Sequence, residues 1–517
     1  MSSTSDITTT SPETDWKYVS EGGATIVFSY IGPPDPVFDG MVLRLRKVPN
    51  VPVGVRDDTD SSDTDEEDEE EEEDPTISFQ RQCMSRLIPS VHLPRLQSVI
   101  VRADPVRSVS IDDQTGVYVQ SQSQSQRTTP REFHGPPHIH SNRWLRTMAK
   151  AHDSERPEGR KKSGGLDVHK QKGVLATDLV GGKGISVEIK PKWSFLPNPT
   201  YLSESTRPIK SQTCRFCMHS FLRSQTSSDD AQAQAHPHAQ GEVALGYCPL
   251  DLFSNDESRV RKALYALWDA WVESGGKVNN LKVFVDGKIL RPDQQRLLLA
   301  KDDAETPEED DIRETFTKGL IPLLTRTSAF QTLNRLQRTL DMLDVEGLGQ
   351  AWKIYHQHRL GVTSELPELG FGMEEPTIDE WMAFIDRYLE QLKTKPAEVD
   401  GREYAFLPGP LPPREGEGEG KLSSYTEQEL RSYLLAYLLS ATFKDCSVII
   451  RIPLLGGGDE VGKVEDTPPD PKRVTIIDLD PKSMTRLRRW ELLDAQIVEG
   501  YREVDAGARK VCVDACA

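Results

Sequence analysis

The stretch Glu188-Ile189-Lys190-Pro191-Lys192-Trp193 decides how we interpret this sequence. It continues the apolar, strand-like run Ile185 to Ile189. Because proline fixes its own φ and donates no backbone hydrogen bond, Pro191 ends the strand and holds the chain rigid at that point. The ammonium groups of Lys190 and Lys192 therefore emerge from a fixed strand end. Lysines in such a position suit the oxygens of a phosphate group better than they suit a hydrophobic core.

The composition predicts a folded protein interrupted by inserts. The chain has 517 residues, enough for two domains, and its apolar fraction of 36% is low for a chain that folds throughout. The segment Asp57 to Asp74 holds 14 acidic residues and no basic one. Since such a run repels itself and stays solvated, we expect a disordered acidic insert. An alternative is that it binds histones or other basic proteins.

The sequence shows no targeting segment. No stretch approaches the roughly 20 apolar residues of a membrane-spanning helix, and the start of the chain does not resemble a secretory signal. Seven cysteines, an odd number, are scattered along the chain and argue for a reducing compartment. We therefore expect no membrane span and a location in the nucleus or cytoplasm. We also expect a monomer and predict no nucleic-acid partner.

Strand and helix signals alternate, which predicts an α+β fold. Residues 1–13, 108–173 and 395–424 are polar or low in complexity and are expected to form a tail, a loop-like insert and a connection. The turn signal Asp286-Gly287 predicts a hairpin, and the capping boxes Ser254–Glu257 and Thr426–Glu429 predict helix starts. The expected strands are 24–30, 41–45, 185–189, 281–285, 446–452 and 474–477, and the expected helices cover 260–271, 312–359, 427–441 and 483–503.

A pair of glycines near the start of the chain suggests a phosphate-binding loop. Gly22 and Gly23, followed by Ala24, stand between two expected strands, where glycine lets a backbone approach a phosphate closely. An ordinary β-turn would look the same. Arg44 follows on what we expect to be the next antiparallel strand, where a kinase-like lobe has a cation against the nucleotide phosphates.

Two expected helices carry basic residues along one face. A single basic stripe is usually a solvated helix surface. Two stripes, together with the paired lysines after the strand, predict a pocket for a polyanion, because such a ligand needs many cations at once. The residues spaced i, i+4 and i+8 are Arg215, His219 and Arg223 in the first helix and Lys482, Arg486 and Trp490 in the second.

Two aspartates stand at strand ends. Asp445 precedes the expected strand 446–452, and Asp478 ends the strand 474–477. Phosphoryl transfer needs one carboxylate near the attacking hydroxyl and another to hold Mg²⁺ on the nucleotide. Aspartate is also common at strand ends as a cap, so the positions alone leave both interpretations open.

Together these motifs resemble the inositol-pentakisphosphate 2-kinase family. The resemblance implies a two-lobed inositol-phosphate kinase fold, remotely similar to protein kinases, that uses ATP and Mg²⁺. It implies phosphorylation of inositol 1,3,4,5,6-pentakisphosphate at the 2-hydroxyl, giving inositol hexakisphosphate. It also implies an N-lobe over 14–189 and a C-lobe over 190–510. The motifs that carry it are EIKPK at 188–192, RFxMH at 215–219, PLDLFS at 249–254, NNLxVF at 279–284, KDCS at 444–447 and IIDL at 476–479.

The resemblance also implies roles for individual residues. Asp445 would be the base on the 2-hydroxyl, Lys190 would lie close to the transferred phosphate, and Asp478 would bind Mg²⁺. The nucleotide would contact Gly22, Gly23, Ala24, Arg44, Glu188 and Asp478. The substrate would contact Lys190, Lys192, Arg215, His219, Arg223, Asn279, Asn280, Lys482, Arg486 and Trp490. The chain departs from the family pattern at Ser20, Thr25 and Trp490, where the family has Gly, Asn and Tyr.

One feature of plant members, a structural zinc bound by Cys and His in the C-terminal half, is not predicted here. Residues 340–430 hold no cysteine and only two histidines, His356 and His358. Cys214 and Cys217 have CxxC spacing, but no second Cys or His pair follows at zinc-finger distance, so we interpret them as facing the core.

Two alternatives to the 2-kinase reaction stay open, and a third, a protein kinase, is disfavoured. A protein kinase should show HRDxxxxN and DFG segments, and neither is present. A kinase of another inositol polyphosphate would share most of the motifs. A non-catalytic inositol-phosphate-binding scaffold would need the basic residues but not both aspartates.

Overall fold

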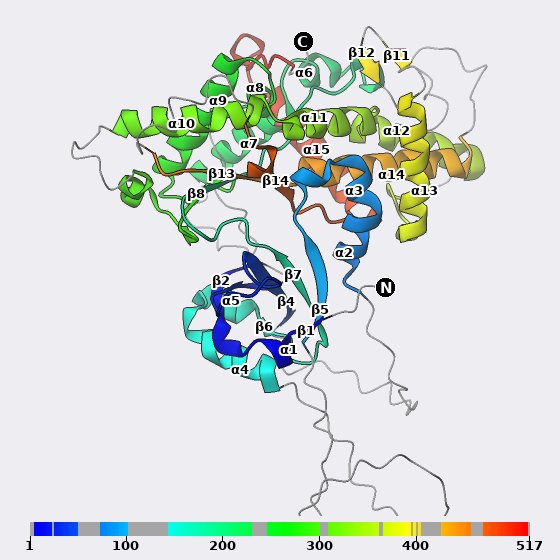
Figure 1. Ribbon diagram of the computed structural model, residues 1–517. Helices are drawn as coiled ribbons and strands as arrows, with labels where there is room; N and C mark the ends of the chain where they lie inside the picture. The colour runs from blue at the N-terminus through cyan, green and yellow to red at the C-terminus, as the bar shows by residue number, and fades with distance from the viewer. Residues whose placement is uncertain are drawn as a thin grey trace, which may run out of the picture. The chain divides into compact units, whose positions relative to one another are not determined.

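The computed structural model forms two compact units (Figure 1), one from Met1–Asp74 and Leu96–Ala176 and the other from Pro75–Arg95 and Thr177–Ala517. We call them unit 1 and unit 2. Both combine helices with sheets whose strands are mainly antiparallel, so the predicted α+β class is confirmed. The residues that the structure describes are 5–22, 25–49, 73–101, 143–229, 246–299, 309–360, 366–393, 397–399, 402–404, 425–455 and 469–514.

Unit 1 is built on a seven-stranded sheet with the order β1-β5-β7-β4-β3-β2, in which β6 also pairs with β4. Apolar side chains of β3, β4 and α4 form its core, among them Phe28, Leu43 and Trp144. The strands are β1 (Ser5–Asp6), β2 (Trp16–Glu21), β3 (Thr25–Tyr30), β4 (Met41–Pro49), β5 (Leu96–Ile100), β6 (Gly164–Leu166) and β7 (Lys172–Thr177), and the helices are α1 (Ile7–Thr10), α4 (Arg143–His152) and α5 (Glu158–Ser163).

Two predictions for unit 1 are wrong. The expected polar tail 1–13 includes β1, which pairs with β5, and Ile7, which is fully buried. The expected loop 108–173 includes α4, α5 and β6, because Trp144 and Met148 lie on one face of α4 and bury it against the sheet. Residues 108–142 and 57–72 of the predicted inserts lie outside the described residues.

Unit 2 contains a five-stranded antiparallel sheet with the order β10-β9-β8-β13-β14. Ile189 at the end of β8 lies opposite Leu281 and Val448, and Ser447 lies opposite Ile477 at the end of β14. The ends of β8 and β14 and the starts of β9 and β13 therefore share one sheet edge. The strands are β8 (Ile185–Ile189), β9 (Leu281–Val285), β10 (Lys288–Ile289), β13 (Ser447–Ile452) and β14 (Val474–Ile477), close to the predicted ranges.

In unit 2, the predicted hairpin turn and one of the two predicted capping boxes are confirmed. Asp286 and Gly287 have φ values of 48° and 78°, as a two-residue hairpin turn requires, and they join β9 to β10. Thr426 and Glu429 form the predicted reciprocal capping box. The other predicted box is wrong: the cap residue is Asp256, whose side chain accepts a hydrogen bond from the backbone of Arg259.

Helices enclose this sheet and form the rest of unit 2. α9, α10 and α11 contact the sheet, α11 and α12 pack on α14, and α7 packs on α15. No helix in the described ranges is long and apolar enough to cross a membrane. The helices are α6 (Arg207–Lys210), α7 (Arg215–Asp229), α8 (Pro249–Leu252), α9 (Glu257–Glu273), α10 (Glu309–Thr325), α11 (Ser328–Leu340), α12 (Asp344–Leu360), α13 (Ile378–Lys393), α14 (Glu427–Lys444) and α15 (Leu487–Arg502).

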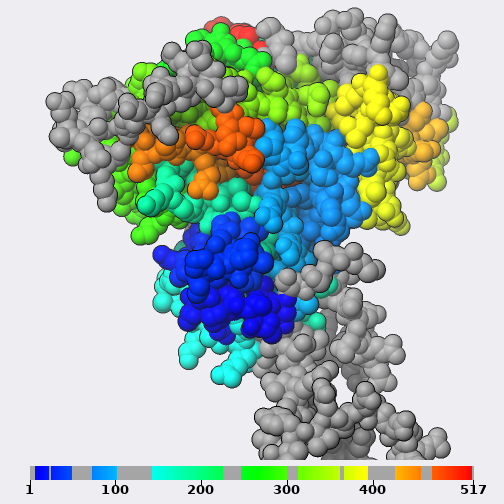
Figure 2. All heavy atoms as spheres, viewed as in Figure 1, coloured from blue at the N-terminus to red at the C-terminus, as the bar shows by residue number. Residues whose placement is uncertain are grey.

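The segment 75–95, which precedes β5, belongs to unit 2. It contains α2 (Pro75–Phe79), a π-helical turn and α3 (Ser85–Leu87). Phe79 contacts the Trp381 ring of α13 edge-on at 5.8 Å, and Figure 2 shows this segment in light blue beside α13 in yellow. Units 1 and 2 thus divide the chain differently from the N-lobe and C-lobe that the resemblance implies. Residues 75–95 and 177–189 fall in the implied N-lobe but lie in unit 2. Most of the connection 395–424 lies outside the described residues, except β11 (Ala397–Val399) and β12 (Arg402–Tyr404).

Candidate functional site

A pocket of about 410 Å³ opens at the shared sheet edge of unit 2. Its walls come from the segments after β8 and before β9 and β13, from the end of α14, and from α7 and α15. Among the described residues, seven lysine and arginine side chains and one carboxylate line it. The charged residues are Lys192, Arg215, Arg223, Lys444, Lys482, Arg486, Arg489 and Asp445, and the others are Trp193, Phe216, His219, Ser220, Asn279, Asn280, Tyr437, Ala441, Trp490 and Leu493.

The pocket brings together nearly all of the predicted substrate residues. The residues of both predicted basic stripes line it, and so do the paired asparagines. The second stripe is not one helix face as predicted, because α15 begins at Leu487, so that Lys482 and Arg486 precede the helix and Trp490 lies on it. Lys190 is the exception among the predicted substrate residues. Its backbone N–H donates to the Asn280 carbonyl at 3.0 Å, and the Asn280 side chain donates back to the Lys190 carbonyl at 3.1 Å. Lys190 thus lies directly beside the pocket without lining it.

Asp445 is held between two lysines. Lys192 and Lys482 each approach its carboxylate at 3.3 Å, from opposite segments of the pocket wall. Burial acts to raise the pKa of Asp445, but these two ammonium groups outweigh it and lower the pKa. The carboxylate is therefore ionised at neutral pH, and with 54% of its side chain exposed it can accept a hydrogen bond from a ligand.

Two non-glycine residues at this edge adopt a left-handed backbone. Lys192 has a φ of 66° and Asp478 a φ of 61°. This region costs a side-chain-bearing residue free energy, so its surroundings must hold it in place. For Lys192, the side chain of Gln337 donates to the backbone carbonyl at 3.1 Å. The Lys192 side chain reaches the Asp445 carboxylate from this held backbone.

A second acidic group lies on the same strands. The Ser447 hydroxyl is 3.1 Å from a Glu188 oxygen and 3.0 Å from an Asp478 oxygen, so it links the two carboxylates. Lys282, opposite Glu188 on β9, pairs with Glu188 at 2.9 Å. Two carboxylates this close, at a strand end, suit a hard divalent cation such as Mg²⁺. Both residues are predicted from the sequence to serve the nucleotide side.

Comparison with known proteins identifies the family of the chain. Residues 18–496 match the family described as inositol-pentakisphosphate 2-kinase. The chain belongs to this family. An inositol-pentakisphosphate 2-kinase of Cryptococcus neoformans is 29% identical over 506 residues, which cover 96% of this chain and 95% of that one. One of Arabidopsis thaliana is 23% identical over 94% of this chain and 93% of its own length. One of Danio rerio is 35% identical over 106 residues, 20% of this chain.

In this 2-kinase family member, the predicted glycine loop lies in unit 1. The Gly22 N–H donates to the Thr25 carbonyl at 2.9 Å, which closes the loop between β2 and β3. Gly23 and Ala24 lie outside the described residues. Arg44 lies on β4 opposite Val27 of β3, as predicted, and makes no ion pair with the described residues.

Glu21, directly before the glycines, is a residue that sequence reasoning missed. Its side chain is 1% exposed and pairs with Lys47 at 2.6 Å and Arg156 at 2.9 Å. Burial would raise the pKa of Glu21, but hydrogen bonds from Arg156 and Lys47 lower it. This buried pairing fixes the base of the loop. The one local sign of this role was that an acidic residue adjoins the paired glycines. Its partners, Lys47 and Arg156, are distant in the sequence, so no local pattern could identify them.

Four buried cysteines form a cluster at the start of α7. The Sγ atoms of Cys214, Cys217, Cys248 and Cys512 all lie within 4.8 Å of one another, and Cys214 and Cys248 are 4.0 Å apart. The Cys217 N–H points at the Cys214 Sγ at 3.4 Å. A tetrahedral zinc with Zn–S bonds of about 2.3 Å holds four sulfurs at such spacings, so this donor set fits zinc. The sequence pattern missed Cys248 and Cys512 as partners because they lie far from the CxxC pair.

Proposed function

We propose that this chain transfers the γ-phosphoryl group of ATP to the 2-hydroxyl of inositol 1,3,4,5,6-pentakisphosphate, forming inositol hexakisphosphate and ADP. The observation that carries the proposal is the position of Asp445 between Lys192 and Lys482: among the described charged residues that line the pocket, it is one carboxylate beside seven cations. A polyanion fills such a pocket, and the carboxylate is available for chemistry on its hydroxyl. Family membership supports the same reaction.

The charge of the pocket favours a highly phosphorylated small molecule. Each phosphate carries roughly −1.5 to −2 at neutral pH, so five of them carry about −8 to −10. Seven lysine and arginine side chains in the pocket lining, among the described residues, offset much of this charge. Guanidinium groups bind phosphates through paired hydrogen bonds, whereas lysines supply compact charge. This number of cations exceeds what the triphosphate of a nucleotide alone requires.

In the mechanism we propose, Asp445 accepts the proton of the 2-hydroxyl as that oxygen bonds to the γ-phosphorus. The bond from the γ-phosphorus to the bridging oxygen breaks, and ADP leaves with the electron pair. Lys190 and Lys192 offset the negative charge on the transferred phosphoryl group. Most of the rate enhancement comes from positioning and from this fixed positive charge.

The nucleotide side of the proposal uses Asp478 and Glu188. These carboxylates, joined through Ser447, would hold Mg²⁺, which when bound neutralises charge on the nucleotide phosphates. The assignment of Gly22, Gly23, Ala24 and Arg44 to nucleotide phosphates stays a prediction from the sequence.

We further propose that Cys214, Cys217, Cys248 and Cys512 bind a structural zinc, against the expectation from the sequence. The short Sγ separations and the burial of all four thiols support this. Zinc there would join the start of α7 to the C-terminal segment around Cys512, and α7 carries Arg215, His219 and Arg223.

The reaction is tested by incubating the purified protein with Mg-ATP and inositol 1,3,4,5,6-pentakisphosphate and separating the products by anion exchange. We expect inositol hexakisphosphate from the wild type and far less of it, in the same time, from Asp445→Ala. Tight binding of the pentakisphosphate without product would instead favour a scaffold. Faster turnover of a different inositol polyphosphate would mean that the chain is a kinase with a substrate other than the one proposed.

A further inference from the structure

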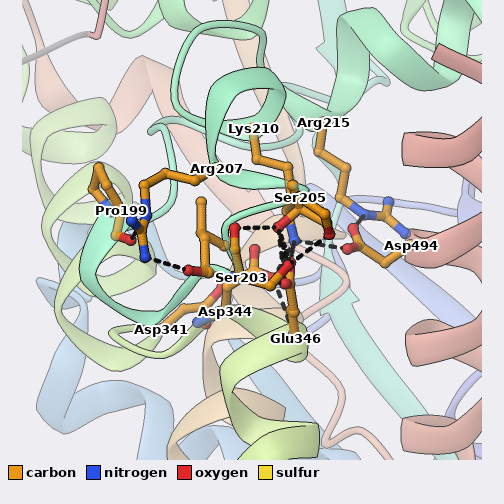
Figure 3. A network of polar contacts seen from close by, with 12 residues as sticks. Pro199, Ser203, Ser205, Arg207, Lys210, Arg215, Asp341, Asp344, Glu346 and Asp494 are labelled. Atoms are coloured by element: carbon orange, nitrogen blue, oxygen red, sulfur yellow. Dashed lines mark hydrogen bonds and ion pairs between the residues drawn. The ribbon is translucent and has the colours of Figure 1, made fainter. Parts of the chain in front are cut away.

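Directly behind the pocket lies a buried network of charged residues (Figure 3). Its centre is Lys210, whose side chain is 1% exposed and whose ammonium contacts Asp344, Asp494 at 2.8 Å and Glu346 at 3.3 Å. The side chains of Asp344 and Asp494 are 2% and 5% exposed. Although burial opposes the charge on Lys210, the three carboxylates raise its pKa, so the ammonium group stays charged.

Asp494 links this network to the pocket. One of its carboxylate oxygens accepts from Lys210, and the other accepts from the Nε of Arg215 at 2.9 Å. Arg215 also lies against the ring of Trp193, with its Cζ 4.9 Å from the ring centre. Both Arg215 and Trp193 line the pocket. Within the described residues, the two Nη groups of Arg215 have no protein partner, so they remain available for a phosphate.

The network connects four helices. Lys210 comes from α6, Arg215 from α7, Asp344 and Glu346 from α12, and Asp494 from α15. Asp494 lies one turn after Trp490 on α15, so it follows the basic stripe toward the interior. The Arg215–Asp494 contact thus joins α7, which carries the first predicted stripe, to α15, which carries Trp490.

A second branch reaches the same wall. Asp344 has a φ of 62°, and its N–H donates to Asp341 at 3.0 Å. Asp341 in turn pairs with Lys444, whose ammonium lies 4.0 Å from the centre of the Trp193 ring. The Trp193 ring therefore contacts two cations, and each is held from behind by a buried aspartate.

Stability alone is a poor reason for such a network. Removing charges from water costs free energy that their attraction often fails to recover, and apolar residues of the same volume can give an equally stable core. A buried charge network does, however, fix the direction of each partner. Since the network reaches the pocket at Arg215 and, through the second branch, at Lys444, the direction of these side chains matters there.

We propose that Asp494 is a positioning residue for substrate binding: with Lys210 behind it, it fixes the Arg215 guanidinium so that both Nη groups face a phosphate of the bound inositol phosphate. This inference rests on the proposed function for the identity of the ligand. It adds Asp494 and Lys210, which touch no substrate themselves, to the residues that determine affinity.

The test is a double-mutant cycle on the full chain with Asp494→Ala, Arg215→Ala and the double variant. Dissociation constants for inositol pentakisphosphate are measured by calorimetry, and KM values for the pentakisphosphate and for ATP by kinetics. We expect each single variant to weaken pentakisphosphate binding about tenfold or more, the size of one lost charge-assisted contact, with the KM for ATP unchanged. The double variant should be no weaker than Arg215→Ala alone.

A matched control is Asp251→Ala. Asp251 is also buried and also bridges an arginine Nε, that of Arg259 at 3.0 Å, and a lysine, Lys262 at 3.3 Å, but it lies outside the pocket lining. It should leave the affinity for pentakisphosphate unchanged. If Asp494→Ala does not fold, Asp494→Asn replaces it, because the amide keeps the volume and one acceptor oxygen; a smaller loss is then expected.

Additive losses in the cycle, an equal loss in Asp251→Ala, or a parallel rise in the KM for ATP would overturn the positioning role. Failure of the proposed function is distinguishable, because it would appear as a wild type that binds pentakisphosphate without forming product. The calorimetric cycle remains decisive in that case.

Discussion

The wall of the pocket and the layer behind it each contain an aspartate that bridges two cations, but the two aspartates have different roles. In the wall, Asp445 bridges Lys192 and Lys482, and its side chain is 54% exposed. Behind the wall, Asp494 bridges Arg215 and Lys210, and its side chain is 5% exposed. Each aspartate accepts from two cations, so the difference between them is access to the ligand.

That difference separates chemistry from positioning. An exposed carboxylate among cations can take a proton from a bound hydroxyl, but it adds nothing to the affinity for a polyanion, because its charge repels phosphate. A buried carboxylate cannot reach the substrate, but it orients a cation that does. Substitutions in the wall should therefore change turnover and binding with little effect on stability, and substitutions behind it should change binding or stability without touching the chemistry.

The largest effect is expected for Asp445→Ala. Turnover should fall by about 10² to 10⁴-fold, the usual contribution of a positioned general base. The affinity for pentakisphosphate should stay the same or rise, since one negative charge leaves the pocket, and ATP binding should be nearly intact. Rapid-quench kinetics measures turnover, and calorimetry measures the binding of pentakisphosphate and of ATP. Weaker binding of pentakisphosphate in this variant would mean that Asp445, like Asp494, supports substrate binding, and would contradict the separate roles proposed for them.

Next in size is the loss of metal from the cysteine cluster behind α7. The wild type, with any affinity tag removed, should carry about one zinc per chain by elemental analysis. Cys248→Ser and Cys512→Ser should lose it and lower the Tm by about 5 °C or more, because zinc binding contributes directly to folding. Cys83→Ser is the matched control, a buried cysteine outside the cluster. A wild type without zinc, or with a disulfide among these cysteines, would rule the site out.

The contrast between wall and layer also explains what the sequence could predict. Helical spacing predicted that Arg215, His219 and Arg223 share a face, and strand ends predicted where Asp445 and Asp478 stand, because both follow from local periodicity. Arg215, His219, Arg223 and Asp445 do line one pocket, and Asp478 stands at the sheet edge where that pocket opens.

The layer behind depends on contacts that no local pattern contains. Lys210, Asp344 and Asp494 come from three helices that are far apart in the sequence, and Cys512 lies near the end of a chain whose CxxC pair begins at Cys214. Buried charges also look like surface charges in a sequence, since their burial depends on partners that only the fold brings together. The helix α4 is a different case, because Trp144, Leu145 and Met148 do have helical spacing; it was missed because it lies within a stretch interpreted as low in complexity.

A third prediction concerns the lysines that flank Asp445. In Lys482→Met one of the two ammonium groups that lower the pKa of Asp445 is absent, so that pKa rises. Because the ionised form is the base, activity should begin to fall at a higher pH on the acid side, by up to about one pH unit, and the KM for pentakisphosphate should rise about tenfold.

Profiles of kcat against pH for wild type and variant measure the shift. Lys472→Met, an exposed lysine outside the pocket lining, should leave both quantities unchanged. An acid limb that stays in place in Lys482→Met would mean that another group than Asp445 sets it.

The smallest effect is expected for His219, a wall residue that titrates. Burial and then the charges of Arg223, Arg215 and Lys192 lower its pKa to about 4. In the unfolded chain the pKa is near 6.5, so between these values the unfolded state binds a proton that the folded state does not. This contribution to stability is complete above about pH 6.5 and is lost as the pH falls toward 4.

His219→Gln should therefore lose less stability than the wild type over that range, by at most about 1.4 kcal/mol per pH unit. Urea unfolding of both proteins at several pH values measures the difference. The Arg223 guanidinium, which donates to the His219 Nε2 at 3.2 Å, acts in the same direction as burial, because a protonated ring could not accept this bond. Identical pH dependence in the two proteins would mean that His219 takes up its proton in the folded state, and that the wall is less positive than its seven cations suggest.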